Sequence, residues 1–461
     1  MNRSLPRSSP SARGVDAAGV LALVDSLEEA PGIELHGLVL VRGGSVVAEG
    51  WWAPYSAERL HLLYSYSKSF TATAVGLAVA EGLVDLDATV LSYFPELDAE
   101  VTDERSRAIR VRHVLAMASG HREETIDRAR AIDPVDMVRG FLLVPPDEEP
   151  GALFAYNQPC TFAAAAIVQR VSGESLVDYL RPRLLDPLGI GEVAWLRDAS
   201  GREIGYSGLH ATTEAAAALA LLYQQEGRWD SEQLLSAEWV AEASTAHVPT
   251  PTGTGDDWTG GYGFQFWRSQ HGFRADGAYG QFGLVLPEHD AVLAITGQTT
   301  DTEGLLARVW EHLLPALLPE GAVAPTGAEE ALATRLGALG LPPLAPAAVD
   351  VAPGRYRPSH SDVLSLTGLE LSVEAAGWTL ALIEGEDRLL VAPGSGEWTT
   401  TDVLASSAGR GPDGELLVDV LFLETPHRLH LVLDDAAATF TARWATEPLH
   451  VGPLRELRAP R

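Results

Sequence analysis

The spacing of hydrophobic and polar residues predicts a first domain that mixes strands and helices. After a helical segment at residues 15–30, the β-rich runs "LHGLVLVRGG" and "SVVAEGWW" are joined by Arg42-Gly43-Gly44, which is typical of a hairpin. From about residue 65 to 242, apolar residues recur with helical spacing between Gly and Pro breaks. Strand patterns return in "FGLVLP" and "AVLAITG", before a last helix, "TEGLLARVWEHLLPALL". This order predicts an α+β fold, in which an antiparallel sheet flanked by helices holds an inserted helical subdomain.

The pattern changes after Leu318. Residues 319–349 are rich in Ala, Pro and Gly and indicate a linker with at most one helix. Beyond them, short β-like runs such as "ELLVDVLFLE" and "HRLHLVLDD" alternate with Gly, Pro or acidic turns. That spacing is typical of an antiparallel barrel or sandwich. We therefore predict a first domain at residues 1–318, a linker at 319–349 and an all-β, barrel-like (lipocalin-like) domain at 350–461.

Composition narrows the range of partners. The chain has 461 residues and a formal net charge of −30. Its length favours two domains, and its acidity argues against nucleic acid or an anionic membrane as a partner, since both need concentrated cations. No apolar run is long enough to span a membrane, and the N-terminal segment does not resemble a signal peptide, so the cytoplasm is the expected location. The oligomeric state is left open.

Metal and cofactor motifs are missing from the sequence. Cys160 is the single cysteine, which excludes an intrachain disulfide. There is no H-E-x-x-H pattern, no cluster of paired cysteines and no Gly-rich phosphate loop followed by a lysine. We therefore expect neither a metal site nor a cofactor.

Lysine occurs once, at Lys68, while all other cationic side chains among the 33 basic residues are arginine. A guanidinium stays protonated, whereas a buried ammonium can lose its proton and become a base. Lys68 follows Ser65 by three residues in "YSYSKSFTATAVG", where an apolar helix begins, so both side chains fall on one helical face. Its amine is therefore within reach of the Ser65 hydroxyl. An exposed lysine that neighbours a serine by chance is the alternative, and the loss of lysine everywhere else argues against it.

A second candidate proton carrier is Tyr156, in "PGALFAYNQ", just before another apolar helix. Tyrosine and lysine have similar unperturbed pKa values, near 10, so a neighbouring pair can share a proton. Taken alone, Tyr156 is better explained as a structural, hydrogen-bonded tyrosine at a helix entry.

Together these motifs resemble the serine β-lactamase and penicillin-binding-protein superfamily, in particular its class C β-lactamase and esterase branch. The resemblance covers about residues 20–317 and rests on "SYSK", "VRHVLAMASG", "PGALFAYNQ" and "ADGAYGQFGLVLPEHDAVLAITG" in the family's order. It implies the same strand-helix-strand fold that the hydrophobic pattern predicts. It also implies that Ser65 is the acylated nucleophile, that Lys68 deprotonates it, and that Tyr156 is a general base that passes the proton to the leaving group.

Two of the motifs depart from the family pattern. The second motif is usually Tyr-x-Asn, but here it is Tyr156-Asn157-Gln158, so either Asn157 or Gln158 supplies the amide. The third motif, usually Lys or His followed by Thr or Ser and Gly, is missing from "RSQHGFRADGAYGQF". In relatives that process β-lactams this cation helps to hold the substrate carboxylate. Its absence disfavours β-lactamase activity, although His271 or Arg274 could substitute for it.

The turn that begins at Asp276 is expected to border the pocket. Glycine there allows a strand N–H to approach the substrate and to join the Ser65 N–H in an oxyanion hole. We place this second donor at Gly277 and Ala278, and a plain Gly-rich turn is the alternative.

The expected activity is that of a serine hydrolase with a Ser-Lys-Tyr catalytic group. It would act on small-molecule or peptidyl esters, amides or thioesters through an acyl-enzyme on Ser65. Transfer to an alcohol or to a peptide's own amine would instead make an acyltransferase or a peptide-cyclising thioesterase of the penicillin-binding-protein type, whose stand-alone members carry a similar C-terminal β domain. A non-catalytic binding protein is the remaining alternative, which the single lysine disfavours.

Overall fold

The first domain is built on an antiparallel sheet that joins strands from both ends of the domain. The computed structural model describes residues 5–250, 256–346, 351–374, 377–450 and 452–461. The sheet order is β2 (Ser45–Trp51), β1 (Ile33–Arg42), β11 (Ala291–Thr299), β10 (Gln281–Leu286), β9 (Phe273–Gly277) and β8 (Trp267–Arg268). β1 pairs with β11 along its whole length, which closes the gap of more than two hundred residues between them.

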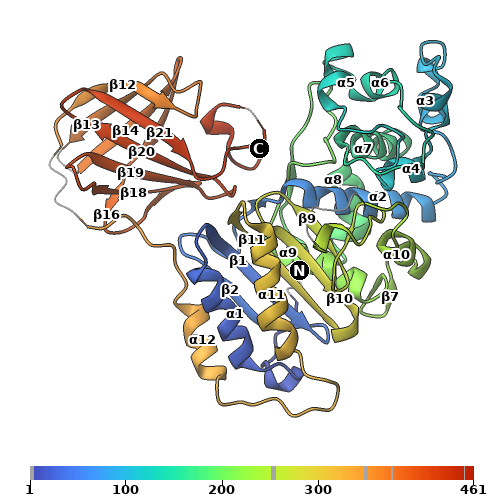
Figure 1. Ribbon diagram of the computed structural model, residues 1–461, viewed down its shortest axis with the longest axis horizontal. Helices are drawn as coiled ribbons and strands as arrows, with labels where there is room; N and C mark the ends of the chain where they lie inside the picture. The colour runs from blue at the N-terminus through green and yellow to red at the C-terminus, as the bar shows by residue number, and fades with distance from the viewer. Residues whose placement is uncertain (1–4, 251–255, 347–350, 375–376, 451) are drawn as a thin grey trace.

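Helices cover both faces of this sheet (Figure 1). Along β1, Leu38 and Leu40 enter one core cluster and Val39 and Val41 enter the other, as expected where successive side chains point to opposite faces. The first cluster is closed by α1 (Ala17–Glu29) and α11 (Thr302–Ala316), which pack on each other. The second is closed by α9 (Thr213–Gln224). Burial on both faces explains why β1 is an almost continuous apolar run.

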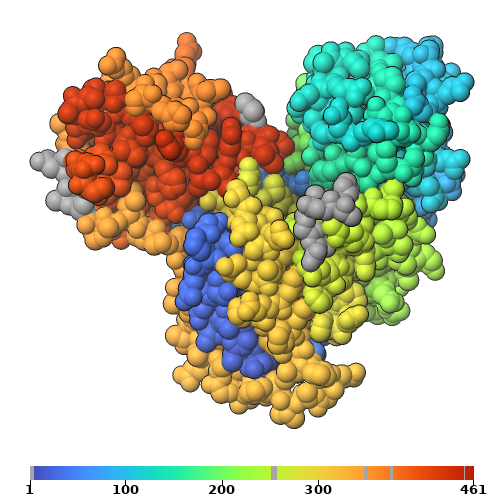
Figure 2. Space-filling model, in the orientation of Figure 1, coloured from blue at the N-terminus to red at the C-terminus, as the bar shows by residue number. Residues whose placement is uncertain are grey.

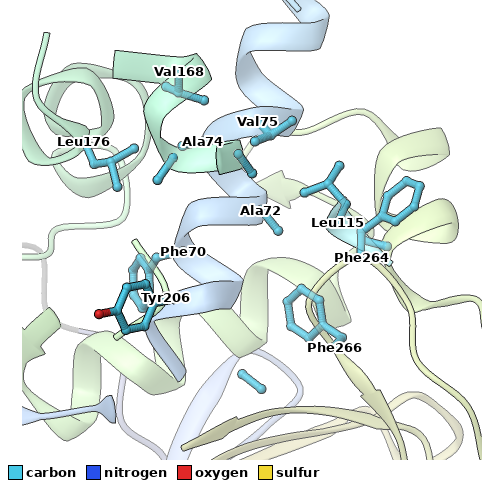
Figure 3. Packing of buried hydrophobic residues seen from close by; sticks show 14 of the residues in the cluster. Phe70, Ala72, Ala74, Val75, Leu115, Val168, Leu176, Tyr206, Phe264 and Phe266 are labelled. Atoms are coloured by element: carbon cyan, nitrogen blue, oxygen red, sulfur yellow. The ribbon is translucent and has the colours of Figure 1, made fainter. Parts of the chain in front are cut away.

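The inserted region is helical and surrounds α2 (Ser67–Ala80). Its other helices are α3 (Glu104–Ala108), α4 (Val111–Leu115), α5 (Ile126–Ile132), α6 (Met137–Leu142), α7 (Gln158–Ser172), α8 (Leu176–Leu180) and α10 (Ala237–Ser244). The short strands β3 (His61–Leu62), β4 (Ala194–Trp195), β5 (Leu209–Ala211), β6 (Arg228–Trp229) and β7 (Glu232–Gln233) lie between them. Every residue of α2 from 67 to 78 is buried, and Figure 3 shows Phe70, Ala72 and Val75 among side chains of the neighbouring segments. Any polar group on α2 is therefore withdrawn from water.

The C-terminal domain is all β, as predicted. Its sheet order is β15 (Asp387–Val391), β14 (Gly377–Glu384), β13 (Gly368–Glu374), β12 (Gly354–Ser361), β21 (Thr439–Trp444), β20 (Arg428–Asp434), β19 (Leu416–Phe422), β18 (Leu404–Arg410) and β16 (Gly394–Ser395), with β17 (Thr399–Thr401) also paired to β18. The sheet curls around a core of its own, and β15 approaches β18 without a ladder between them in the described part of the chain. The domain is therefore a half-barrel rather than a closed barrel.

The segment between the two domains is packed on the first one. It contains α12 (Glu329–Gly337), which lies against α1 and β2. Leu332, Leu339 and Leu341 are buried in the same core cluster as α1. The sequence pattern allowed for one helix here, but its Ala-rich and Pro-rich composition did not indicate that the helix would be part of the core.

The two domains meet on the side of the sheet where the helical region begins. Figure 2 shows the C-terminal domain and the helical region on opposite sides above the sheet. Arg428 Nη1 lies 2.8 Å from Glu34 Oε2, and Glu424 in the β19–β20 turn accepts a 2.8 Å hydrogen bond from the backbone N–H of Leu62 in β3. Across the described ranges, no helix combines the length and the apolar character that crossing a membrane requires.

We expect Leu332→Ala to lower the free energy of unfolding by about 2–5 kcal/mol, because it would leave a cavity beneath α12. Leu364→Ala is the matched control, since Leu364 is 95% exposed, and it should change stability by less than about 0.5 kcal/mol. Urea unfolding of both variants measures the difference. Equal urea-unfolding midpoints for the two variants would mean that α12 links the domains without stabilising the first one.

Candidate active site

Ser65 lies on a tight turn between β3 and α2. The preceding residue, Tyr64, has a φ of 48°, a left-handed conformation that side chains other than glycine rarely adopt. Tyr66 N–H donates to Leu63 O at 3.1 Å, and the Ser67 hydroxyl donates to Tyr64 O at 2.5 Å, so the turn is pinned from within. Ser65 is partly exposed while both neighbours are buried. The fold thus presents this serine to solvent on a fixed backbone.

Lys68 is one turn further along α2, and its amine faces three oxygen atoms. Nζ lies 3.0 Å from Ser65 Oγ, 2.6 Å from Gln158 Oε1 and 2.6 Å from Tyr206 O. Amide and carbonyl oxygens can only accept hydrogen bonds, whereas a hydroxyl can also donate. When Lys68 loses one proton, its two remaining hydrogens therefore stay with Gln158 and Tyr206, and its lone pair faces Ser65.

Burial makes this loss of a proton accessible near neutral pH. Lys68 is 1% exposed, and desolvation lowers its pKa from 10.5 to about 7. The negative charges of Glu124 and Asp276 partly oppose that shift. An arginine in this position would remain charged and could not accept a proton.

Tyr156 completes the group of polar side chains around Ser65. Its hydroxyl is hydrogen-bonded to the Ser65 side chain, and its ring centroid is 4.8 Å from Lys68 Nζ. The ring stacks on Trp267 at 5.8 Å and meets the ring of Tyr262 edge-on at 6.2 Å. Burial raises the pKa of Tyr156 well above its ordinary value, so the resting phenol keeps its proton. In the resting state the available base is therefore the Lys68 amine.

The two amides after Tyr156 have different partners. Gln158, the first residue of α7, supplies the oxygen that contacts Lys68. Asn157 is fully buried, and its Oδ1 accepts hydrogen bonds from the backbone N–H and the hydroxyl of Thr125 at 3.0 and 2.9 Å. Of the two alternatives that the sequence left open, the geometry brings Gln158 to the amine, while Asn157 holds a neighbouring loop.

The end of β9 lies against the Ser65 turn at Gly277. A Cβ atom at this position would be 2.2 Å from Leu63 O, closer than any side chain permits, and a tight 3.2 Å from Tyr66 N. Glycine is therefore required by close approach of the two backbones. Ala278 follows directly, and its carbonyl accepts a 3.1 Å hydrogen bond from Gln281 Nε2. The structure thus brings the Gly277-Ala278 backbone beside Ser65.

Neither of the two candidate substitute cations is free beside Ser65. Arg274 is fully buried, its Nη2 lies 2.9 Å from Asp276 Oδ2, and its guanidinium packs over the ring of Trp258. His271 lies in the β8–β9 turn, where its ring meets Trp310 of α11 edge-on at 5.2 Å. At about 3.3 Å per residue, His271 is roughly 20 Å along the strand from Gly277. The structure therefore does not bring His271 together with the other candidate residues.

Two groups at the site escaped the sequence analysis. One is the backbone carbonyl of Tyr206, which carries no sequence signal because any residue has one. The other is Glu124, whose carboxylate accepts hydrogen bonds from the backbone N–H groups of Thr125, Ile126 and Gln158 and whose charge favours the protonated form of Lys68. Its position is set by the fold of the helical region rather than by spacing from Ser65. In the described ranges no set of three or more His, Cys, Asp or Glu could hold a metal ion.

Comparison with known proteins places the chain in a family. Residues 22–317 match the family model described as Beta-lactamase, which accounts for most of the first domain. The chain belongs to the β-lactamase family. Within the β-lactamase family it is 26% identical to 6-aminohexanoate-dimer hydrolase of Paenarthrobacter ureafaciens over 306 residues, 61% of this chain and 76% of that protein. It is 28% identical to lovastatin esterase of Penicillium rubens over 170 residues, 32% of this chain and 42% of the esterase.

A solved structure extends the likeness to the C-terminal domain. The crystal structure of SurE with D-Leu is 21% identical, covers 87% of this chain and 93% of its own chain, and has a TM-score of 0.50. At this identity it shows a shared fold alone. The likeness therefore extends beyond the β-lactamase family match and includes much of the half-barrel.

The single lysine allows a direct test of the Lys68 pKa. Lysine labelled with ¹³C at Cε should give one side-chain resonance, which we expect to titrate near pH 7. Glu124→Gln should move the midpoint to lower pH, because it removes a negative charge that stabilises the ammonium form.

The control is Glu123→Gln, at an exposed neighbour that pairs with Arg128 instead. It should leave the midpoint in place. A midpoint near 10.5 in the wild type, or no difference between the two variants, would contradict this electrostatic account.

Proposed function

We propose that this chain is a serine hydrolase that cleaves carboxylic esters or amides through an acyl-enzyme on Ser65. The observation that carries the proposal is the environment of Lys68, a buried amine whose pKa is lowered to about 7 and whose free lone pair faces Ser65 Oγ at 3.0 Å. A serine hydroxyl needs such an adjacent base to become a nucleophile at neutral pH. The membership of the β-lactamase family supports the same reading.

In the proposed reaction the Lys68 amine removes the Ser65 proton while Oγ forms a bond to the substrate carbonyl carbon. The carbonyl oxygen takes up the negative charge, and the proposed stabilising donors are the backbone N–H groups of Ser65 and of the Gly277-Ala278 segment. As the intermediate collapses, the Tyr156 hydroxyl gives its proton to the departing alcohol or amine and is reprotonated by the Lys68 ammonium. Water then attacks the acyl-enzyme and loses a proton to the Lys68 amine. The bond between the acyl carbon and Ser65 Oγ breaks, Oγ takes that proton back, and the acid is released.

The names of the relatives favour ester or amide substrates. One relative is named a hydrolase of 6-aminohexanoate dimer and another an esterase of lovastatin. The residues at the third motif argue against a β-lactamase, because Arg274 is committed to Asp276 and His271 lies far along the strand. We therefore rank hydrolysis of uncharged esters or amides above hydrolysis of β-lactams.

A second candidate is transfer of the acyl group to an amine, as in a peptide-cyclising thioesterase or an acyltransferase. The observation that favours it is the two-domain likeness to SurE, which was solved with D-Leu. Hydrolysis and transfer share every step up to the acyl-enzyme and differ only in the acceptor. Incubation with a peptidyl thioester separates them, because hydrolysis yields the free acid and transfer yields a cyclic or aminolysed product.

Covalent labelling tests the shared step. We expect a fluorophosphonate to add its mass to wild-type protein at Ser65 and to leave Ser65→Ala unmodified. Ser69→Ala is the control, because the buried Ser69 hydroxyl donates to Gln265 O, away from Lys68, and it should still be labelled. An adduct on another residue would contradict the role of Ser65, and no adduct at all would favour a non-catalytic binding protein.

The role of the amine calls for a separate comparison. Lys68→Arg keeps the positive charge but removes the group that can accept a proton, and Lys68→Met removes both the charge and that group. Each should slow labelling and turnover of a p-nitrophenyl ester by about 100-fold to 10,000-fold, the usual contribution of a general base. Near wild-type rates in Lys68→Arg would falsify the assigned role.

A further inference from the structure

The C-terminal domain reaches the first domain beside the candidate active site. The contacts come from His427, in the β19–β20 turn, and from residues 445–450, which follow β21 and are called the docking segment below. Figure 1 shows this end of the half-barrel facing the first domain. Hydrogen bonds join the docking segment and His427 to Tyr64, Tyr279 and Ser207 of the first domain, and each of these is the chain neighbour of a group at the site.

The first of these is Tyr64, which precedes Ser65. Its hydroxyl lies 2.5 Å from His427 Nε2 and accepts a 3.3 Å hydrogen bond from the backbone N–H of Leu449. Its ring stacks on His450, with centroids 5.6 Å apart and an interplanar angle of 18°. The left-handed residue that sets the orientation of Ser65 is thus held by the other domain.

The proton in the Tyr64–His427 bond can be assigned. His427 Nδ1 lies 2.9 Å from Thr446 O, and a carbonyl can only accept, so Nδ1 carries the hydrogen. Burial lowers the pKa of His427 to about 3, so the ring is neutral and Nε2 is an acceptor. The Tyr64 phenol therefore donates to Nε2. This is a directional bond with its donor fixed on one domain and its acceptor on the other.

The second residue is Tyr279, which follows Ala278. It too has a left-handed backbone, with a φ of 64°. Its hydroxyl donates to Glu447 O at 2.5 Å, and its ring meets those of Tyr64 and His427 edge-on at 5.6 and 5.7 Å. The same domain that holds the residue before Ser65 also holds the residue after Ala278.

The third residue is Ser207, which follows Tyr206. Its hydroxyl lies 2.8 Å from Nε2 of His450 in the docking segment. The neighbouring carbonyl, Tyr206 O, is the acceptor that fixes one hydrogen of the Lys68 amine. The docking segment therefore contacts the chain neighbours of three groups. These groups are the proposed nucleophile Ser65, the proposed oxyanion donor Ala278, and Tyr206, whose carbonyl accepts a hydrogen bond from Lys68.

We propose that the C-terminal domain positions the reacting groups: through His427 and the docking segment, it holds Tyr64 and Tyr279 so that the backbone N–H groups of Ser65 and Ala278 converge on one oxyanion. The inference rests on the proposed function. Left-handed residues other than glycine persist only where surrounding contacts hold them. Here the first domain holds the backbone carbonyls of Tyr64 and Tyr279, and the second domain holds their side chains. Tyr64 and Tyr279 are positioning residues, since neither is placed to touch the acyl group.

Conservative substitutions in the full-length chain test this role. Tyr64→Phe and Tyr279→Phe each keep the ring and remove one hydroxyl that bonds to the C-terminal domain. Misplacing an oxyanion donor slows the chemical step, so kcat for a p-nitrophenyl ester and the rate of labelling by a fluorophosphonate should each fall about 10-fold to 100-fold. KM should change little, and the pH midpoint should stay, because Lys68 and Tyr156 are untouched. The fold-decrease in kcat of the double variant should be smaller than the product of the two single-variant decreases, since both hydroxyls bond to the same end of the C-terminal domain.

Tyr55→Phe is the matched control. The Tyr55 hydroxyl also donates to the C-terminal domain, at 3.3 Å to Thr425 O, but Tyr55 is not a chain neighbour of any group at the site. It should keep the wild-type kcat even if it lowers the melting temperature by as much as the other two substitutions. Equal kcat in all three variants, with wild-type protein still labelled on Ser65, would overturn the positioning role alone. Absence of labelling in the wild type would overturn the proposed function and this inference with it.

Discussion

The dehydrated amine of Lys68 is the interaction on which the surrounding structure depends. Removal of an ammonium from water costs several kcal/mol unless its hydrogens find partners, and here the result is a pKa lowered to about 7. The burial is possible because α2 is enclosed on every side and is rich in Ala, Gly, Ser and Thr, which admit close neighbours. Gly76 is an example, since a Cβ there would be 2.4 Å from the Trp239 ring. The helix is thus a buried support for one basic group.

A second constraint is the backbone on either side of Ser65. The close approach at Gly277 and the left-handed conformations of Tyr64 and Tyr279 place two peptide segments side by side, although they are more than two hundred residues apart in the chain. Strained conformations of this kind are retained where several contacts hold them at once. Contacts from β5, β9 and the half-barrel meet there, so the turn that carries Ser65 is held by both domains rather than by its own helix alone.

Much of the fold could be predicted from the sequence because its strands and helices obey local rules. The strand-helix-strand order, the inserted helical region and the all-β C-terminal domain followed from periodicity and turn residues. The Ser65–Lys68 pairing could be anticipated because three residues are one helical turn. The choice between Asn157 and Gln158 could not, because it depends on how α7 is oriented toward α2. The burial of α12 was also missed, since an Ala-rich and Pro-rich segment shows weak periodicity even when a few leucines pack into a core.

The sequence by itself determined that the chain has a single lysine, Lys68, and therefore a single amine side chain that can become a neutral base. It did not determine where that base would find its partners. Tyr206 O and Glu124 come from distant segments and act on Lys68 through position, while His427 bonds to Tyr64 from the other domain. These positions arise only when the sheet, the helical region and the half-barrel pack together. His271 shows the converse. It is a suitable residue type and lies near the right motif in the sequence, but in the structure it is far along the strand from Ser65. Chemical type is a local property of the sequence, whereas convergence in space is decided by tertiary packing.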